Sequence, residues 1–456
     1  MNKNLHLDLK SIMPGSSILT GEEELICYSS DATRLMGTPE VVVRPDRTDS
    51  ISEIMAIAAS HNMPVVPRGA GTGLSGGCVP SRGGIVVVTE KLNRIIDIDP
   101  VDLVATVEPG VVTAKLHEAA EAVGLFYPPD PASFKACTIG GNIAENAGGL
   151  RGLKYGVTRD YTMGLDLVLP SGKKINTGGR TLKNVTGYDL TRLMAGSEGT
   201  LGFITGATLK LIPKPEAKAG FLAAYPTLES ASEAVVSVIK SGIIPSTLEI
   251  MDNVTIKAVK AYQGADIMDC GAMLLIEVDG FEREVNSQAE KLRITLSKTG
   301  ATEIRQAVDP EEQTTLWTAR RSALTALARV APSVVLEDAT VPRSQIPALV
   351  RAIGAIADKY GLLIGTFGHA GDGNLHPTII TDLRVEVNRK KVEAAVSEIF
   401  NAALALGGTL SGEHGIGLAK APFMESEVGA DGIKAMKAIK HAFDPAGIMN
   451  PGKIFT

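Results

Sequence analysis

A glycine-rich run near residue 70 limits the folds that this chain can adopt. The residues Gly71-Thr-Gly-Leu-Ser-Gly76 match the GxGxxG pattern, and they follow a short apolar strand predicted over 64–67. In dinucleotide-binding folds that pattern opens a helix, so that the pyrophosphate meets the helix N-terminus. Here Gly76 leads into Gly-Cys-Val-Pro80 and then into an apolar strand over 84–89, which leaves no place for that helix. The sequence therefore argues against a Rossmann-type fold.

The same loop is nevertheless suited to binding an anion. Residues 68–74 (Arg-Gly-Ala-Gly-Thr-Gly-Leu) carry little side-chain bulk, so consecutive backbone N–H groups can form an anion-binding concavity without a helix. A diphosphate is the expected guest, and a glycine-rich surface turn is the alternative. The 48 glycines of the chain concentrate in a few clusters, which indicates backbone approaching a ligand rather than general flexibility.

Composition excludes several classes of protein. A net charge of -6 without a basic block argues against a nucleic-acid partner. The four scattered cysteines predict no disulfide framework, no cysteine metal site and no iron–sulfur centre, and they fit a reducing cytoplasm. The N-terminus lacks an apolar signal core, and no apolar run approaches the ~20 residues of a spanning helix. We expect a cytoplasmic protein, with peripheral association with the inner membrane as an open alternative.

A chain of 456 residues predicts two or three domains. We expect a helical lead-in over 1–36, an α+β domain over 37–215, a second domain over 216–430 and a turn-rich closing segment over 431–456. In the first domain we predict strands at 41–44, 64–67, 84–89, 95–98, 105–107, 165–169 and 207–212, and helices at 48–61, 112–123 and 185–193, the first of them capped by Thr48 or Asp49. In the second, helices at 228–241, 282–299, 345–360 and 385–406 alternate with strands at 273–278, 334–338 and 362–367, which favours a helix-backed, mostly antiparallel sheet.

Two segments combine histidines with glycines. They are Gly368-His369-Ala-Gly-Asp-Gly-Asn-Leu-His376 and Ser411-Gly-Glu413-His414-Gly-Ile-Gly417. We expect the first to be a loop that follows the strand over 362–367, because its glycines do not suit a packed helix. A histidine pair with a carboxylate from a separate loop is a suitable ligand set for Zn²⁺, Mn²⁺ or Fe²⁺, with positions left for substrate oxygens. The other histidines are assigned no such role: His6, His61, His117 and His441.

Together these motifs resemble the vanillyl-alcohol-oxidase-type flavoproteins, in particular the branch of D-lactate dehydrogenase, glycolate oxidase and D-2-hydroxyglutarate dehydrogenase. The resemblance extends over the whole chain. The motifs that carry it in the first domain are Pro67–Gly77, Pro128–Pro131, Cys137–Asn142, Glu145–Gly149 and Gly196–Gly202. It implies an α+β fold, with a two-subdomain FAD-binding domain and a substrate (cap) domain built on an antiparallel sheet.

The resemblance also implies the FAD site. The loop 68–75 would hold the diphosphate, Ile204 would lie by the adenine, and Asn450 would approach the flavin ring unless it only ends a helix. The loop has no histidine, so we expect non-covalent FAD, and we do not expect Cys78 to tether it. The implied cofactor residues are Pro67, Arg68, Gly69, Ala70, Gly71, Thr72, Gly73, Leu74, Ser75, Pro131, Thr138, Gly141, Asn142, Asn146, Gly148, Glu198, Ile204 and Asn450.

In the second domain the resemblance implies metal ligands at His369, His376 and Glu413, a catalytic base at His414 and a substrate carboxylate partner at Arg320. Zinc is the first choice of metal, with manganese or iron as alternatives. A cation bound by the substrate's hydroxyl and carboxylate oxygens lowers the hydroxyl pKa, and an imidazole can then take the proton. The flavin N5 receives the hydride. The substrate would thus contact Arg320, His369, His376 and His414. The alternative for Arg320 is a solvated helical arginine.

The expected function is oxidation of a small 2-hydroxy acid, D-lactate or glycolate, to the 2-oxo acid. Leu324 and Leu336 stand where hydroxyglutarate-specific relatives have polar residues, which leaves D-2-hydroxyglutarate as the alternative substrate. Electrons would pass to a separate acceptor, such as an electron-transfer flavoprotein, an iron–sulfur subunit, a quinone or a cytochrome. The chain would act as a homodimer or as a subunit of a complex. Two other functions stay open: an FAD-binding electron-transfer subunit without turnover, and a non-redox exchange like that of the ether-lipid synthase relatives.

Overall fold

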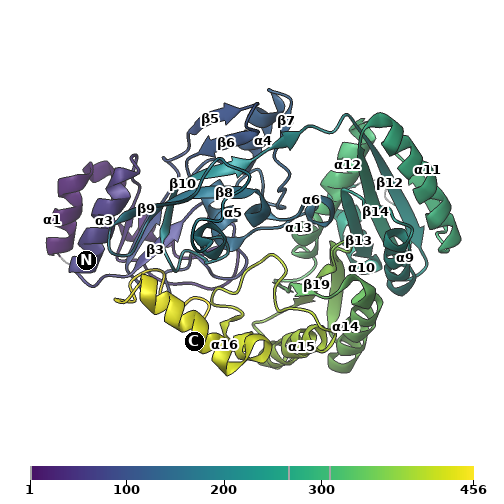
Figure 1. The fold of residues 1–456 in the computed structure, drawn as a ribbon. Helices are drawn as coiled ribbons and strands as arrows, with labels where there is room; N and C mark the ends of the chain where they lie inside the picture. Colours follow the sequence, from purple (N-terminus) through teal and green to yellow (C-terminus); the bar gives the residue numbers. More distant parts are fainter. Residues whose placement is uncertain (1–2, 265–267, 308–309, 456) are drawn as a thin grey trace. The chain divides into compact units, whose positions relative to one another are not determined.

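The computed structural model describes residues 3–264, 268–307 and 310–455, and it divides into two compact units (Figure 1). Unit 1 contains residues 1–148, 157–214 and 413–456. Unit 2 contains residues 149–156 and 215–412. The chain therefore returns to unit 1 at Glu413, earlier than the position 431 expected from the sequence. It also enters unit 2 briefly at 149–156, which no sequence pattern indicated.

The first sheet of unit 1 has the strand order β1-β2-β4-β3, in which β2, β4 and β3 are parallel. Its strands are β1 (Ile18–Leu19), β2 (Val41–Val43), β3 (Val65–Arg68) and β4 (Ile85–Val88). The strands β2 and β4 consist only of valine and isoleucine and are buried along their whole length, because both faces of the sheet are covered. Leu5 and Leu9 of α1 (Lys3–Ile12) and Ile54 of α3 (Asp49–Ser60) pack into the same core.

The second sheet of unit 1 is antiparallel, with the order β5-β6-β10-β8-β9. Its strands are β5 (Ile95–Asp99), β6 (Val104–Val107), β8 (Thr162–Val168), β9 (Lys174–Gly178) and β10 (Phe203–Lys210). The remaining elements of unit 1 are α2 (Glu22–Ile26), α4 (Thr113–Glu121), β7 (Leu125–Phe126), α5 (Ile139–Glu145), α7 (Thr158–Tyr161), α8 (Leu190–Met194), β11 (Ile212–Pro213) and α16 (Met424–Phe443). The short α5 lies between the glycine clusters and contacts β10.

Unit 2 is built on one large antiparallel sheet with the order β15-β12-β14-β13-β18-β19-β16, to which β17 adds by pairing with β19. Its strands are β12 (Ala217–Tyr225), β13 (Thr247–Asp252), β14 (Ala272–Gly280), β15 (Glu303–Gln306), β16 (Ser333–Leu336), β17 (Ala339–Thr340), β18 (Leu363–His369) and β19 (Asn374–Thr381). Its helices are α6 (Gly152–Tyr155), α9 (Leu228–Lys240), α10 (Asn253–Gln263), α11 (Glu282–Lys298), α12 (Pro310–Arg321), α13 (Ala323–Leu327), α14 (Ile346–Tyr360) and α15 (Glu386–Ala405).

Helices cover both faces of this sheet, and the side chains of its strands alternate between two cores (Figure 1). On β14, Leu274 and Ile276 belong to the core shared with α9, α11, α14 and α15, whereas Met273 and Leu275 belong to the core shared with α10, α12 and α13. Successive residues of a strand point to opposite faces, so each face collects every second apolar side chain. The predicted helix-backed antiparallel sheet is confirmed.

The histidine-rich segment is a β-hairpin, so the prediction of a loop over this stretch was wrong. His369 ends β18 and pairs with Asn374, the first residue of β19, and only residues 370–373 form the turn. The glycine at 373 has φ of 91°, and an added Cβ would lie 2.0 Å from a backbone oxygen of Val341. The glycines therefore serve the tight turn and close backbone approach, and they leave both histidines inside strands.

The predicted helix over 185–193 was also largely wrong, because residues 181–189 are irregular and exposed and α8 begins only at Leu190. Asp189 caps that helix by accepting the N–H of Arg192, so the helix begins only after it. The predicted cap of α3 is not formed by a side chain, since Thr48 makes no such hydrogen bond. Among the described residues, no helix is both long enough and apolar enough to cross a membrane.

The packing of α11 against the core of unit 2 can be tested by substitution. Leu292 is fully buried, whereas Ile294 on the same helix is 43% exposed. We expect Leu292→Ala to lower the free energy of unfolding by about 2–5 kcal/mol, because it leaves a cavity. Ile294→Ala should change it by about 0.5 kcal/mol or less. Urea unfolding of both variants measures the difference, and equal effects would contradict the described packing.

Candidate functional site

The glycine loop of unit 1 folds onto the start of α5. Residues 69–84, all described, connect β3 to β4 without a helix, as the sequence predicted. An added Cβ at Gly69 would lie 2.3 Å from Thr138 Oγ1, so only glycine allows this approach. Thr138 Oγ1 in turn accepts the N–H of Gly141, in the first turn of α5. Arg68 is buried, and its Nη1 donates to the Ser30 carbonyl at 2.7 Å.

Three of the predicted cofactor residues share a left-handed backbone, which is rare outside glycine. Their φ values are 54° at Asn146, 51° at Glu198 and 43° at Asn450. Such conformations persist where the surroundings fix them, and they often cluster at ligand sites. The Asn450 Nδ2 donates to the carbonyls of Gly77 (2.9 Å) and Glu198 (2.7 Å), so it joins two of the glycine clusters.

Glu198 has a role that the sequence did not reveal. Its two carboxylate oxygens accept the N–H groups of Ile416 and Gly417, both at 2.7 Å. The same side chain therefore fixes the segment that carries Glu413 and His414 within unit 1. An added Cβ at Gly148 would lie 2.7 Å from Glu413 Oε2. The Glu413 carboxylate therefore lies against the backbone of the motif Glu145–Gly149. No local sequence signal indicates this pairing, because 218 residues separate Glu198 from Ile416.

Burial dominates the acid–base properties around this loop. It raises the pKa of the Glu145 carboxyl far above its usual value, and the nearby charges of Glu198 and Asp31 raise it further. Burial also raises the pKa of the Cys78 thiol to about 11. Cys78 therefore remains a thiol at neutral pH, and a thiol is a poor nucleophile.

The residues of this region fit a flavin nucleotide. Ser75 Oγ, Glu145 Oε2 and Asn450 Oδ1 lie out of solvent without a hydrogen-bond partner among the described residues, as expected for groups that face a ligand. Residues 69–74 stay at least partly exposed although they lie between buried strands. Of the other predicted contacts, Asn142 donates its amide to Thr113 Oγ1 at 2.7 Å, and Ile204 lies in β10. Pro131 is buried, and its carbonyl accepts the N–H of Phe134.

Arg320 lies inside unit 2 rather than on its surface. It occupies the last turn of α12 with 4% of its surface exposed. Its Nη2 lies 2.5 Å from Glu249 Oε2, and the two side chains form an ion pair. The geometry of this contact does not meet the criteria of a hydrogen bond. The guanidinium lies over the Phe367 ring, 4.7 Å from the centroid. The alternative of a solvated helical arginine is therefore wrong for this residue.

The two histidines of the hairpin lie side by side in unit 2. The ring centroids of His369 and His376 are 5.1 Å apart, and a nitrogen of each lies within 4.8 Å of the other. His369 Nδ1 lies 2.7 Å from Glu249 Oε1. Glu249, fully buried on β13, thus contacts both His369 and Arg320. Burial alone would raise the pKa of the Glu249 carboxyl, but the neighbouring Arg320 and His369 outweigh burial and hold it below the usual value.

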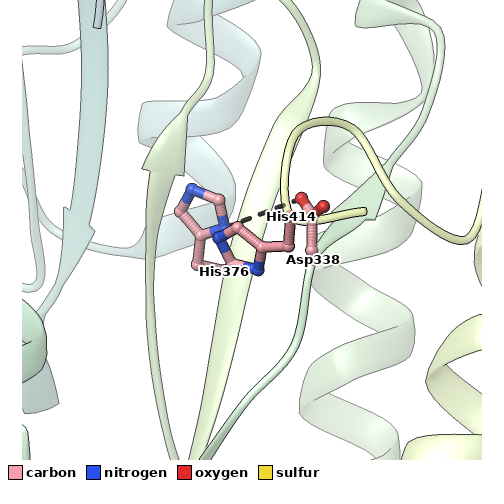
Figure 2. A group of neighbouring side chains, drawn as sticks. All are labelled: Asp338, His376 and His414. Carbon is pink, nitrogen blue, oxygen red and sulfur yellow. Dashed lines mark ion pairs between the residues drawn. The ribbon is translucent and has the colours of Figure 1, made fainter. Parts of the chain in front are cut away.

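A second buried carboxylate, Asp338, lies beside His376. Figure 2 shows the Asp338 carboxylate next to the His376 ring, with 3.8 Å between Oδ1 and Nδ1. Asn374 Nδ2 donates to Asp338 Oδ1, and Ser411 Oγ donates to Oδ2 at 2.7 Å. Asp338 therefore joins the hairpin to the segment that ends unit 2.

The end of unit 2 lies close to the histidine pair. An added Cβ at Gly412 would lie 2.7 Å from Asn374 Nδ2, so the backbone packs directly on the hairpin. Glu413 and His414, which is drawn in Figure 2, are the next two residues along the chain. Consecutive Cα atoms are about 3.8 Å apart, so Glu413 directly follows the residue that packs on the hairpin.

Comparison with known proteins identifies the family. The model of the FAD binding domain matches residues 39–178, and the model of the C-terminal domain of FAD linked oxidases matches residues 214–454, more than half of the chain. The chain is 51% identical over 432 residues to the glycolate oxidase subunit GlcD of Bacillus subtilis, covering 94% of this chain and 92% of that protein. It is 34% identical over 458 residues to a D-lactate dehydrogenase of Anaerostipes hadrus, covering 98% and 96%.

Solved structures show the same fold at low sequence identity. The 4-ethylphenol oxidase of Gulosibacter chungangensis matches with a TM-score of 0.81 and 18% identity, covering 99% of this chain and 96% of that chain. A p-cresol methylhydroxylase matches with a TM-score of 0.80 and 17% identity over the same shares. The fold and the glycine-rich site define an FAD-dependent oxidoreductase with a vanillyl-alcohol-oxidase-type fold. The chain belongs to the FAD linked oxidases, and is similar there to glycolate oxidase GlcD and D-lactate dehydrogenase.

The link formed by Asn450 can be tested directly. Asn450→Ala removes two donors and leaves the carbonyls of Gly77 and Glu198 buried without them, so we expect a loss of about 2–4 kcal/mol in the free energy of unfolding. FAD should also be lost on gel filtration. Asn93→Ala, at an exposed Asn93 that donates to the Glu90 carbonyl, is the matched control and should keep both stability and FAD. Full FAD retention and unchanged stability in Asn450→Ala would refute the described role.

Proposed function

We propose that this chain oxidises a small 2-hydroxy acid, D-lactate or glycolate, to the 2-oxo acid and passes the electrons to a separate acceptor. The observation that carries the proposal is the grouping of His369, His376 and Arg320 inside unit 2. The similarity of the chain to a glycolate oxidase subunit and to a D-lactate dehydrogenase supports the substrate class.

FAD is proposed to bind non-covalently to unit 1, at the cofactor residues that the resemblance implies. Loop 68–75 offers its backbone N–H groups to the diphosphate, and Ser75, Glu145 and Asn450 offer the buried polar atoms that lack a protein partner. The buried, protonated thiol of Cys78 supports the absence of a covalent tether. When bound, FAD would supply the acceptor for the hydride that leaves the substrate carbon.

A divalent metal, zinc in the first place, is proposed to bind His369, His376 and Glu413. Two buried imidazoles in contact, with a carboxylate one residue beyond Gly412, are a donor set that suits zinc, and manganese or iron are the alternatives. The bound ion would supply a Lewis acid for the substrate hydroxyl. The buried carboxylates of Glu249 and Asp338 compensate the positive charge that such a site concentrates.

The chain's own residues account for the remaining steps. Arg320 binds the substrate carboxylate, for which its planar guanidinium is suited, and Phe367 beneath it fixes the plane of the guanidinium. His414 takes the hydroxyl proton as the carbon–hydrogen bond breaks. The substrate thus loses one hydride and one proton and becomes the 2-oxo acid.

Apolar side chains near Arg320 favour a monocarboxylate. Leu324 and Leu336 pack in the same cluster as Phe367 and Ala319, on the face of the sheet where Arg320 lies. A second substrate carboxylate placed among these side chains would lose its hydration without a partner. D-2-hydroxyglutarate remains the alternative substrate.

The electron acceptor is proposed to be a separate molecule. The four cysteines are free and scattered, so the chain does not itself provide an iron–sulfur centre. The relatives named as a subunit of glycolate oxidase support a place in a multi-subunit assembly. An FAD-binding electron-transfer subunit without turnover, the alternative of another class, would not need the His369, His376 and Arg320 group.

Anaerobic reduction of the bound flavin tests this function. D-Lactate or glycolate should bleach the visible flavin absorbance of the FAD-loaded protein, whereas L-lactate should not. His376→Ala should slow bleaching by about 100-fold or more, because it removes a ligand of the Lewis acid. Chelation should slow the wild type similarly, and added zinc should restore it. His441→Ala, at an exposed position of α16, is the matched control and should bleach at the wild-type rate.

Two outcomes would contradict parts of the proposal. Undiminished bleaching in chelated His376→Ala would reject the metal and keep the flavin chemistry. Absence of bleaching by any 2-hydroxy acid in fully FAD-loaded protein would reject the dehydrogenase and favour the electron-transfer subunit or the non-redox exchange.

A further inference from the structure

The buried carboxylate of Glu249 lies between His369, the proposed metal ligand, and Arg320, the proposed substrate-binding residue. Glu249 is on the central strand β13 with none of its surface exposed. Its Oε1 lies 2.7 Å from His369 Nδ1, and its Oε2 lies 2.5 Å from Arg320 Nη2. Each oxygen therefore has a different partner, one on β18 and one on α12. All three residues belong to unit 2 and are fixed by the same sheet and helices.

Stability alone does not explain this arrangement. Taking a carboxylate and a guanidinium out of water is costly, and a buried ion pair often stabilises a fold no better than apolar residues of similar size. Glu249 is also flanked along the strand by apolar residues, since Leu248 and Ile250 are buried in the core on the opposite face of the sheet. A charged residue in the middle of an apolar strand is therefore better explained by what it does to its two partners.

We propose that Glu249 is a positioning residue that joins the metal ligand His369 to the substrate-binding Arg320. The inference rests on the proposed function, in which those two residues bind metal and substrate. Because the Glu249 carboxylate accepts from Nδ1, the proton of the neutral ring stays on Nδ1, and Nε2 is left as the metal ligand. A carboxylate behind a ligating imidazole also raises its basicity and fixes its orientation.

On its other side Glu249 fixes the direction of Arg320. One oxygen holds Nη2, and Phe367 holds the plane of the guanidinium, so the remaining N–H groups point in one direction. Among the residues that the structure describes, Arg320 Nε lies out of solvent with no hydrogen-bond partner, as expected for a donor that binds a ligand. The side chain of Glu249 would thereby fix the distance between the metal bound at His369 and the substrate carboxylate bound at Arg320.

Asp338 provides an internal contrast. It lies 3.8 Å from His376 Nδ1, beyond hydrogen-bond distance, and its oxygens accept from Asn374 and Ser411 instead. The carboxylate beside His369, in contrast, is within hydrogen-bond distance of the ring and also pairs with Arg320.

The test compares Glu249→Gln, His369→Ala and the double variant in the FAD-loaded full chain. Zinc affinity is measured by competition with a chelator, and KM and kcat for D-lactate are measured with a dye as acceptor. Asp252→Asn is the control, because it removes another buried carboxylate from the same strand, one that accepts from Thr255 and Thr366. Visible flavin spectra report whether the FAD site is intact.

Glu249→Gln should weaken zinc binding about 10–100-fold with an unchanged flavin spectrum. Its KM should rise about fivefold or more, because Arg320 loses the buried negative charge with which it forms an ion pair. Asp252→Asn should stay within about twofold of the wild type in both quantities. In the His369→Ala background, Glu249→Gln should not weaken zinc binding further, since its effect acts through that ring.

Wild-type zinc affinity and KM in Glu249→Gln would overturn the inference. So would effects that add fully in the double variant, because they would indicate a general structural role. If the wild type itself binds no zinc, the proposed metal site fails and the inference fails with it. If the wild type binds zinc but D-lactate and glycolate do not reduce its flavin, the proposed function fails while the zinc measurements still decide the role of Glu249.

Discussion

Buried charge is the constraint on which the site in unit 2 depends. Arg320 and Glu249 are both within the protein, where an unpaired charge would be far more costly than at the surface. They are tolerated because they form an ion pair, and Arg320 and His369 hold the pKa of the Glu249 carboxyl below its usual value in spite of its burial. The sheet matters to function mainly because it fixes these residues on adjacent strands and a covering helix.

Unit 1 meets a different requirement, the close approach of backbone to a large ligand. Glycines at 69 and 71 allow the loop to fold onto α5 and onto Arg68, where any side chain would collide. The left-handed residues Asn146, Glu198 and Asn450 come from segments far apart in the sequence, and Glu198 and Asn450 are joined by a hydrogen bond. Glu198 also accepts the N–H groups of Ile416 and Gly417, so it fixes the segment that contains Glu413 and His414.

Features that depend on local sequence patterns could be predicted from the sequence. The missing helix after Gly76 follows from the proline and glycines at 77–84, and the antiparallel sheet of unit 2 follows from long helical periods between short apolar strands. The hairpin was missed because its glycines were interpreted as a loop, whereas a turn over 370–373 needs only part of them. Pairings between distant residues leave no local signal. Glu249 lies in an apolar strand, 71 residues before Arg320 and 120 before His369, and nothing in the intervening sequence connects them.

The central claim is that the two histidines of the β18–β19 hairpin bind a metal to which the substrate coordinates. X-ray absorption at the zinc edge, on FAD-loaded protein with and without glycolate, tests it most directly. We predict two imidazole nitrogens at about 2.0–2.1 Å together with oxygen ligands, and a change in the oxygen shell when glycolate is added. A spectrum with sulfur ligands, with no imidazole, or without any response to glycolate would contradict the account.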